Sequence, residues 1–269
     1  SCLSVPTGNR SLPRPVALSL IALLVLPALA GASDFPPWAG EEEAIESLLR
    51  EAEVAEREDI ARGVTKPQRL SLERGGKTAQ AVWKPLRPGY YEGYWESWQA
   101  EVMAYRLARW LGMNVVPPTV ERKLGAMQGS LQYWVDHFRM YEEVEGQAPL
   151  TASWSQQLAR MKFLDNLMHN RDRNAGNFLV DDQWNIVLID HSRAILHERK
   201  LLQGKNVLPV TFDRNLVERL RELDLDTAQE LLGDLLKKSQ VKALVKRSEA
   251  MLAYVEDCEA ERGDSIYFE

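Results

Sequence analysis

The chain has 269 residues, of which 45% are hydrophobic, so it can fill the core of one large domain or of two small lobes that share a cleft. This composition argues against disorder throughout the chain. The formal net charge of -6 argues against a nucleic-acid-binding protein, because such proteins normally carry a basic excess that neutralises phosphates. We therefore expect no nucleic-acid partner.

The N-terminal segment, residues 1–32, has two arginines and no acidic residue, and it is almost wholly apolar from 16 to 32. Small residues at Ala28, Ala30 and Ala32 have the spacing that a signal peptidase requires, which predicts a signal peptide over 1–32. The alternative is an uncleaved membrane anchor, although a helix over 16–32 would span only about 25 Å, less than a bilayer core of about 30 Å.

These two interpretations predict a protein that is exported, to a periplasm or to the outside of the cell, or one that associates with a membrane through residues 16–32. A third interpretation starts from residue 1, which is Ser: the printed frame begins upstream of the true start, and the protein is cytoplasmic. We leave the three open.

The first half of the rest of the chain combines helical and strand patterns. Apolar residues recur on one side of a charged segment over 41–62, which predicts an amphipathic helix. Two glycines at 75 and 76 separate two alternating segments and predict a hairpin turn. In chain order we expect a helix over 41–62, strands over 68–73 and 78–84, a helix over 94–111, and strands over 115–122 and 130–135.

The second half is mainly helical. We expect helices over 153–169, 215–223, 227–237 and 241–256, with two short strands over 178–180 and 186–189. A β-rich half followed by a helical half predicts a small lobe and a large lobe with a cleft between them.

An aromatic cluster precedes residue 101. Packing in the core is the expected role of these side chains, and binding of an acceptor is the alternative. The cluster consists of Tyr90, Tyr91, Tyr94, Trp95 and Trp98.

The densest polar cluster spans 170–177, between the helix over 153–169 and the strand pair over 178–189. Loops in such positions often carry catalytic groups. Phosphoryl transfer needs a carboxylate that orients the acceptor hydroxyl, and oxygen ligands that hold metal against the phosphates. Asp172 would be the base or orienting group, and Asn177 and Asp190 would be hard oxygen ligands for Mg²⁺.

The motif Asp172-Arg173-x-x-x-Asn177, followed by Ile189-Asp190, resembles the active-site signature of phosphatidylinositol 3-/4-kinase-like enzymes, especially the type II phosphatidylinositol 4-kinases. It is also similar to that of the secretory-pathway kinases of proteins and proteoglycan xylose, and of bacterial toxin serine kinases. The alternative is a polar turn with incidental Asp and Asn.

The resemblance implies an α+β, two-lobed protein-kinase-like fold with a β-rich small lobe and a larger, mainly helical lobe. The catalytic domain would span 60–257, with lobes of about 60–135 and 136–257. Residues 33–59 would form a linker and an N-terminal helix, and 258–269 a C-terminal tail.

The same resemblance assigns further residues to the nucleotide. Lys84, at the end of an apolar strand, would contact the α- and β-phosphates, with Glu101 as the carboxylate that holds it and Glu96 as the weaker candidate. Backbone groups near Val135 would bind adenine. Gly63 and Thr65 would belong to the loop that covers the phosphates, although that segment is not rich in glycine.

The function implied is a kinase that moves the γ-phosphate of ATP, with Mg²⁺ or Mn²⁺, to a hydroxyl group on a protein, a lipid head group or a sugar. The alternative is a non-catalytic, kinase-shaped scaffold that is exported or membrane-anchored. An enzyme is favoured because every residue of the expected machinery is present, whereas a degenerate kinase typically lacks at least one.

Overall fold

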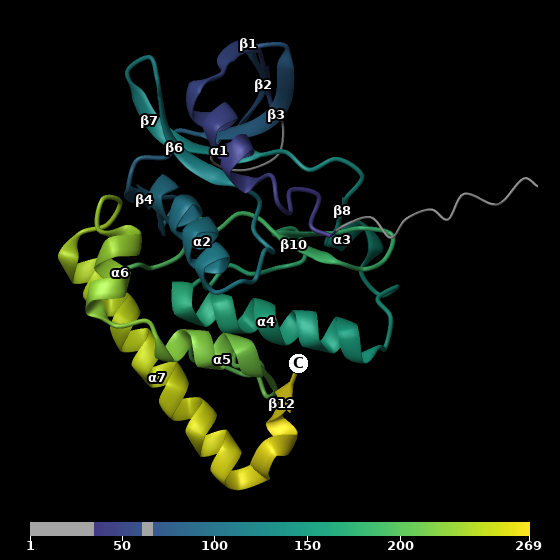
Figure 1. Cartoon of the computed structure of the whole chain (residues 1–269), viewed down its shortest axis with the longest axis vertical. Helices are drawn as coiled ribbons and strands as arrows, with labels where there is room; N and C mark the ends of the chain where they lie inside the picture. Colours follow the sequence, from purple (N-terminus) through teal and green to yellow (C-terminus); the bar gives the residue numbers. More distant parts are fainter. Residues whose placement is uncertain (1–34, 61–66) are drawn as a thin grey trace, which may run out of the picture. The chain divides into compact units, whose positions relative to one another are not determined.

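The structure is a computed structural model that describes residues 35–60 and 67–269, all within one unit of the chain, Asp34–Glu269 (Figure 1). The predicted signal peptide or anchor over 1–32 lies outside the described residues, as do Gly63 and Thr65. In the part that is described, no helix has both the length and the apolar character needed to cross a membrane.

The small lobe is built on a five-stranded antiparallel sheet with the order β1-β2-β3-β7-β6. Alternate side chains of its strands face a core that includes Leu70, Ala81 and Trp83. Two helices, α1 and α2, pack against this sheet. The elements are α1 (Glu42–Glu51), β1 (Glu53–Asp59), β2 (Gln68–Arg74), β3 (Lys77–Lys84), α2 (Trp98–Trp110), β6 (Thr119–Leu124) and β7 (Met127–Tyr133).

The predicted hairpin between β2 and β3 is confirmed, since Arg74 pairs with Lys77 and both Gly75 and Gly76 have positive φ. The helix predicted over 41–62 is wrong in its second half. It ends at Glu51, and the chain continues as β1, which pairs with β2. The charged sequence of β1 favours a helix locally, but the backbone hydrogen bonds to β2 outweigh that preference, and charges are tolerated on an edge strand.

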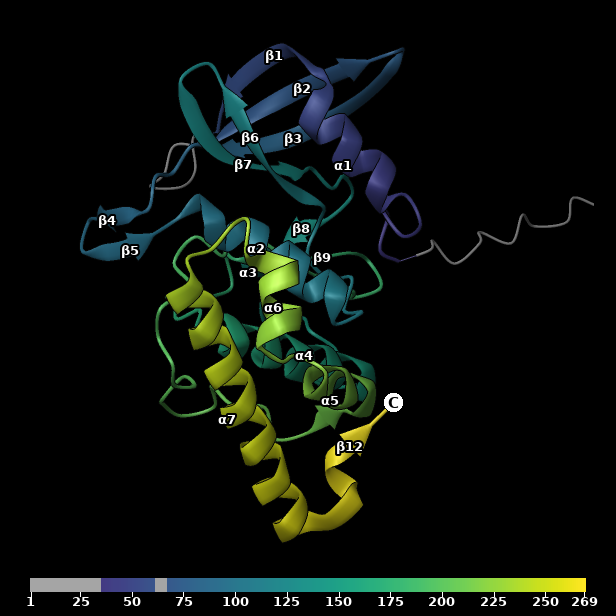
Figure 2. The same cartoon turned by 60° about the vertical axis from the view of Figure 1, so that its left-hand side comes forward.

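The helix predicted from residue 94 begins later, at Trp98. Residues Tyr94–Glu96 form β5, which pairs with β4 (Gly89–Tyr91), and this hairpin projects from the domain (Figure 2). Ser97 then caps α2 by accepting a hydrogen bond from the backbone N–H of Gln99 at 3.1 Å.

Core packing is confirmed for Trp98, which is 7% exposed, and is wrong for Tyr90 and Tyr94, which are 75% and 55% exposed on the hairpin. The strand predicted from residue 115 likewise begins only at Thr119. Pro117 and Pro118 lack the N–H that a strand donates.

The large lobe is mainly helical, and α4 lies at its centre, packed against α2, α7 and β11. All four predicted helices and both predicted strands are present. The elements are β8 (Arg139–Met140), α3 (Tyr141–Val144), α4 (Ala152–Met168), β9 (Phe178–Val180), β10 (Ile186–Leu188), β11 (Phe212–Asp213), α5 (Arg214–Arg221), α6 (Leu225–Leu232) and α7 (Lys238–Arg262).

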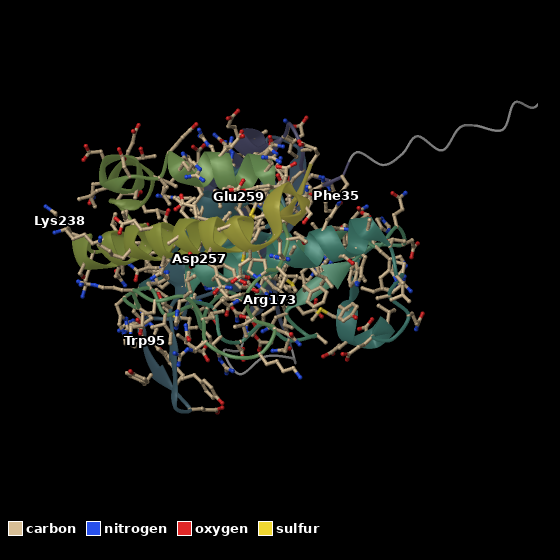
Figure 3. The ribbon with its side chains drawn as sticks, turned by 90° about the horizontal axis from the view of Figure 1, so that it is seen from below. Phe35, Trp95, Arg173, Lys238, Asp257 and Glu259 are labelled. Atoms are coloured by element: carbon tan, nitrogen blue, oxygen red, sulfur yellow. The ribbon has the colours of Figure 1, made fainter. Side chains whose placement is uncertain are left out.

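The C-terminal residues 258–269, predicted as a tail, form regular secondary structure. Helix α7 continues to Arg262, past the predicted end of the domain at residue 257, and Figure 3 follows it from Lys238 to Asp257 and Glu259. A short 3₁₀ helix, Gly263–Ile266, then leads into β12 (Tyr267–Phe268), which pairs in parallel with β11. Residues 258–269 are therefore packed on the large lobe.

The segment before residue 60 also contributes to the fold. Trp38 is fully buried against Val135 and Val187. Glu46 on α1 accepts hydrogen bonds from the Tyr105 hydroxyl at 2.8 Å and from Arg109 at 2.6 Å, both on α2. This segment therefore supports α2 and the strand end at Val135.

The Glu46 carboxylate should stabilise the docking of α1 on α2. Burial alone would raise the pKa of Glu46, but hydrogen bonds from Tyr105 and Arg50, and the charge of Arg109, outweigh it and lower that pKa below 4.5. We expect Glu46→Gln to lower the free energy of unfolding near neutral pH by about 1–3 kcal/mol, measured by urea denaturation.

The pH dependence of this loss follows from the lowered pKa. The stabilisation by Glu46 is complete above pH 4.5, its ordinary pKa, and is lost as the pH falls through the lower native value. The difference between wild type and variant should therefore shrink in acid. Glu43→Gln is the matched control: Glu43 also pairs with Arg109, but its side chain is 89% exposed, so its loss should cost less than about 1 kcal/mol. Equal losses from the two variants would contradict this assignment.

Candidate active site

A cavity of about 500 Å³ lies beside the strand end that joins the two lobes. One part of its wall is apolar, with Val82 from β3 and Leu179 from β9, and Val135 lies on it as well. Its polar end contains Lys84, Asn177 and Asp190. Its size and mixed lining are typical of a small-molecule or cofactor site. The full lining is Ile60, Pro67, Val82, Lys84, Pro117, Gln132, Tyr133, Trp134, Val135, Phe138, Arg139, Met140, Glu142, Glu143, Asn174, Gly176, Asn177, Leu179, Ile189 and Asp190.

Lys84 ends β3 and points its ammonium group between two carboxylates. Its Nζ lies 2.6 Å from Oε1 of Glu101 and 3.1 Å from Oδ1 of Asp190. The predicted Lys84–Glu101 ion pair is therefore confirmed, and the alternative partner Glu96 is wrong. Burial alone would lower the pKa of Lys84, but the charges of Asp190 and Glu101 outweigh it and raise that pKa above its ordinary value. Lys84 is thus a fixed cation at the polar end of the cavity.

Close backbone packing sets the position of Lys84. A Cβ on Gly129 of β7 would lie 2.5 Å from the carbonyl oxygen of Lys84, so only glycine allows β7 to approach the end of β3 this closely.

Helix α2 is tied to the loop that follows β10. The backbone N–H of His191 donates to Oε2 of Glu101 at 3.0 Å, and that of Ser97 donates to the carbonyl oxygen of Ser192 at 2.9 Å. Burial alone would raise the pKa of Glu101, but Lys84 and the hydrogen bond from His191 outweigh it and lower that pKa. Glu101 therefore stays charged and joins α2 to both β3 and this loop.

The loop that carries Asp172 begins where α4 ends, at His169, whose positive φ of 51° turns the chain out of the helix. Oδ2 of Asp172 accepts from Nδ2 of Asn177 at 3.3 Å and from Nη1 of Arg193 at 3.2 Å. Asp172 does not itself line the cavity, but it lies next to Asn177, which does. The carboxylate is therefore at the edge of the cavity, beside its polar end.

A buried ion pair holds this loop on the large lobe. Arg173 and Asp165 are 10% and 5% exposed in their side chains, and Nη2 of Arg173 lies 2.9 Å from Oδ1 of Asp165. Nη1 of Arg173 donates to the backbone carbonyls of Asn177 and Ile189. Figure 3 labels Arg173. The motif contains Arg173, but sequence reasoning gave it no role, because its partners come from α4 and from the end of β10.

Asn177 and Asp190 fit the role of ligands for a divalent cation. The amide nitrogen of Asn177 is engaged by Asp172, so its amide oxygen is available to the cavity. Asp190 uses Oδ1 for Lys84 and Ser192, and it retains a second oxygen. Its φ of 54° is uncommon for a residue with a side chain. Hard oxygen donors of this kind suit Mg²⁺ or Mn²⁺.

The Arg173–Asp165 pair should dominate the stability of the loop. We expect Asp165→Asn to lower the free energy of unfolding by about 3–5 kcal/mol in urea denaturation, because it leaves a buried guanidinium without its countercharge. The matched control is Asp182→Asn, which removes the partner of Arg139 in a pair whose Asp182 side chain is 93% exposed. The control should lose less than about 1 kcal/mol. If Asp165→Asn also lost less than about 1 kcal/mol, the Arg173–Asp165 pair would not be what holds the loop.

Comparison with known proteins agrees with this geometry. Residues 94–256, more than half of the chain, match the family described as phosphatidylinositol 3- and 4-kinase. The match includes Glu101, Asp172, Asn177 and Asp190, and it begins after Lys84. Compared by sequence with curated proteins, the chain has no significant match.

Several solved structures have a similar fold. The structure of hydra Fam20 with sugar superposes with a TM-score of 0.64 and 16% identity, over 85% of this chain and 92% of that one. The Golgi casein kinase with Mn/ADP bound has a TM-score of 0.60 and 15% identity, over 83% and 77% of the two chains. The Helicobacter pylori proinflammatory kinase CtkA has a TM-score of 0.52 and 12% identity, over 82% and 99%.

The fold predicted from the sequence is confirmed: a β-rich small lobe and a larger, mainly helical lobe, in a chain whose fold is similar to those of these solved structures. The family match covers both the Asp172 loop and the loop after β10. The chain therefore belongs to the phosphatidylinositol 3- and 4-kinase family and is a kinase.

Proposed function

We propose that this kinase transfers the γ-phosphate of ATP to a hydroxyl group, with Mg²⁺ or Mn²⁺ as the metal. The observation that carries the proposal is the convergence of Lys84, Asn177 and Asp190 at the polar end of one cavity, with Asp172 at its edge. The Mn/ADP bound to the similar Golgi casein kinase supports the choice of nucleotide and metal.

Each residue has a role that follows from its surroundings. Lys84, fixed by Glu101, binds the phosphates, and the apolar wall with Val135 receives the adenine ring. Asn177 and Asp190 hold the metal, which when bound neutralises the charge on the phosphates. The segment with Gly63 and Thr65, outside the described residues, keeps its predicted role in covering the phosphates.

Asp172 orients the acceptor. A carboxylate that accepts a hydrogen bond from the acceptor hydroxyl fixes the attacking oxygen and takes up the proton as the new bond to phosphorus forms. The acceptor is a hydroxyl on a protein, a lipid head group or a sugar. The similar structures support more than one of these classes, because they include a casein kinase and a Fam20 structure with sugar.

We also propose that the chain is exported or associates with a membrane through residues 16–32. The apolar composition of that segment supports export or anchoring, and the similarity of the fold to a Golgi kinase is consistent with it.

Binding of nucleotide should depend on metal. A ligand present at about 100 times its Kd stabilises the native state by about 2.7 kcal/mol. We expect ATP to raise the melting temperature much more with Mg²⁺ or Mn²⁺ than with a chelator, and Asp190→Asn to remove most of this difference. Asp182→Asn, on an exposed turn, is the control and should keep it. Equal shifts with metal and with chelator would count against Asn177 and Asp190 as ligands.

Transfer should depend on Asp172 while binding does not. We expect Asp172→Asn to lower the rate of phosphate transfer from labelled ATP by about 10²–10⁴-fold, the usual effect of losing a positioned base. Its affinity for Mg²⁺-ATP should stay within a few-fold of wild type. Full activity in this variant would show that the Asp172 motif is only a turn. A wild type that binds Mg²⁺-ATP but transfers to no protein, lipid or sugar would instead support the non-catalytic scaffold.

A further inference from the structure

Arg193 connects two carboxylates from distant parts of the chain. Its Nε donates to Oε1 of Glu96 at 3.0 Å, and its Nη1 donates to Oδ2 of Asp172 at 3.2 Å. Its guanidinium also lies 4.2 Å from the centroid of the Tyr94 ring. One side chain on the loop after β10 therefore joins the proposed catalytic carboxylate to strand β5 of the small lobe.

The residues around Arg193 are buried or make further contacts of their own. Glu96 is 1% exposed and directly precedes Ser97, the residue that caps α2 and donates its N–H to Ser192. On the other side, the Trp95 ring, labelled in Figure 3, packs edge-on against His197 with centroids 6.2 Å apart. Arg193 thus lies between two contacts that hold its loop to the hairpin.

The two oxygens of Asp172 differ in their surroundings. Oδ2 accepts from both Arg193 and Asn177, whereas Oδ1 has no hydrogen-bond partner among residues 35–60 and 67–269. The Asp172 side chain is 32% exposed, so Oδ1 can be reached by an incoming molecule. The contacts to Oδ2 therefore set the direction of the free oxygen.

We infer that Arg193 is a positioning residue for phosphate transfer: with Asn177 it holds one oxygen of Asp172, so that the other faces the acceptor hydroxyl. This inference rests on the proposed function. In the step, Oδ1 takes the hydroxyl proton and later releases it to solvent. The acceptor oxygen bonds to the γ-phosphorus, and the bond from that phosphorus to the oxygen bridging to the β-phosphate breaks and leaves ADP. Arg193 acts through Asp172 only.

The chemistry of arginine suits this role better than that of lysine. A guanidinium has a planar fork of donors that can bind two carboxylates in fixed directions, whereas an ammonium is a single flexible donor group. A displacement of a catalytic group by about 1 Å can cost roughly 10²-fold in rate. Replacing the Arg193 guanidinium should therefore lower the rate of phosphate transfer, although the change is not made in a group that binds ATP or the acceptor.

The test compares variants of the full chain by their rate of ATP turnover, measured as ADP release together with autophosphorylation. We expect Arg193→Met to lower kcat by about 10²-fold while KM for Mg²⁺-ATP stays within about threefold, since Arg193 is not among the residues that line the cavity. Arg193→Lys should recover part of this loss. In the Asp172→Asn background, Arg193→Met should lower the remaining rate by less than about threefold, because residues that act as a unit are not additive.

Two further variants separate positioning from folding. Arg193→Met leaves the buried Glu96 unpaired, so the double variant Glu96→Gln/Arg193→Met removes that charge as well and should fold with the same loss of kcat. Arg160→Met is the matched control, because Arg160 also donates to a carboxylate, Asp213, at 2.7 Å and lies 5.1 Å from the centroid of the Phe268 ring. It should lower the melting temperature but keep kcat.

The outcomes distinguish the inference from the proposed function. A wild type without turnover, or Asp172→Asn with full turnover, would overturn the proposed function and the inference with it. Arg193→Met with the kcat of wild type would overturn the inference alone. An equal loss of kcat on Arg193→Met in the wild-type and Asp172→Asn backgrounds, together with weaker binding of ATP, would also overturn the inference, because that pattern indicates a structural role.

Discussion

The site depends first on the bidentate pairing of Arg173 with Asp165. The guanidinium binds the carboxylate on α4 and also donates to the carbonyls of Asn177 and Ile189. A buried ion pair stabilises a fold only when its remaining donors are satisfied, and here each guanidinium nitrogen of Arg173 donates to backbone or carboxylate. Because Ile189 directly precedes Asp190, one side chain fixes the backbone beside both proposed metal ligands.

Helix α2 connects the loops of the site to the small lobe. Along one side of the helix, Glu101 binds Lys84 and the backbone of His191, and farther along Tyr105 and Arg109 bind Glu46 of α1. The helix is therefore held at successive points along its length by charge-assisted hydrogen bonds, which are stronger than neutral ones. The contact of Glu96 with Arg193 adds a third connection, to the side of the site where an acceptor would enter.

Much of this arrangement could be predicted from the sequence. The mainly helical character of the second half predicted α4, α5, α6 and α7, and the paired glycines located the β2–β3 turn. The polar cluster over 170–177 and the carboxylate of Asp190 at the tip of a strand were predicted from the sequence, and Asn177 and Asp190 both line the polar end of the cavity. Lys84 and its ion pair with Glu101 were both predicted from the resemblance.

The remaining features could not be predicted from the sequence, because each depends on a partner that is far away along the chain. Strand β1 has a charged sequence that is compatible with a helix, and its pairing with β2 makes it a strand. By sequence, Glu96 and Glu101 are both plausible partners for Lys84. In the structure the chain changes from strand to helix at Ser97, and Glu96 contacts Arg193 instead. Arg193 belongs to no local pattern. Its role arises from the distance between its guanidinium and Asp172, which no spacing along the chain encodes, because long-range packing sets it.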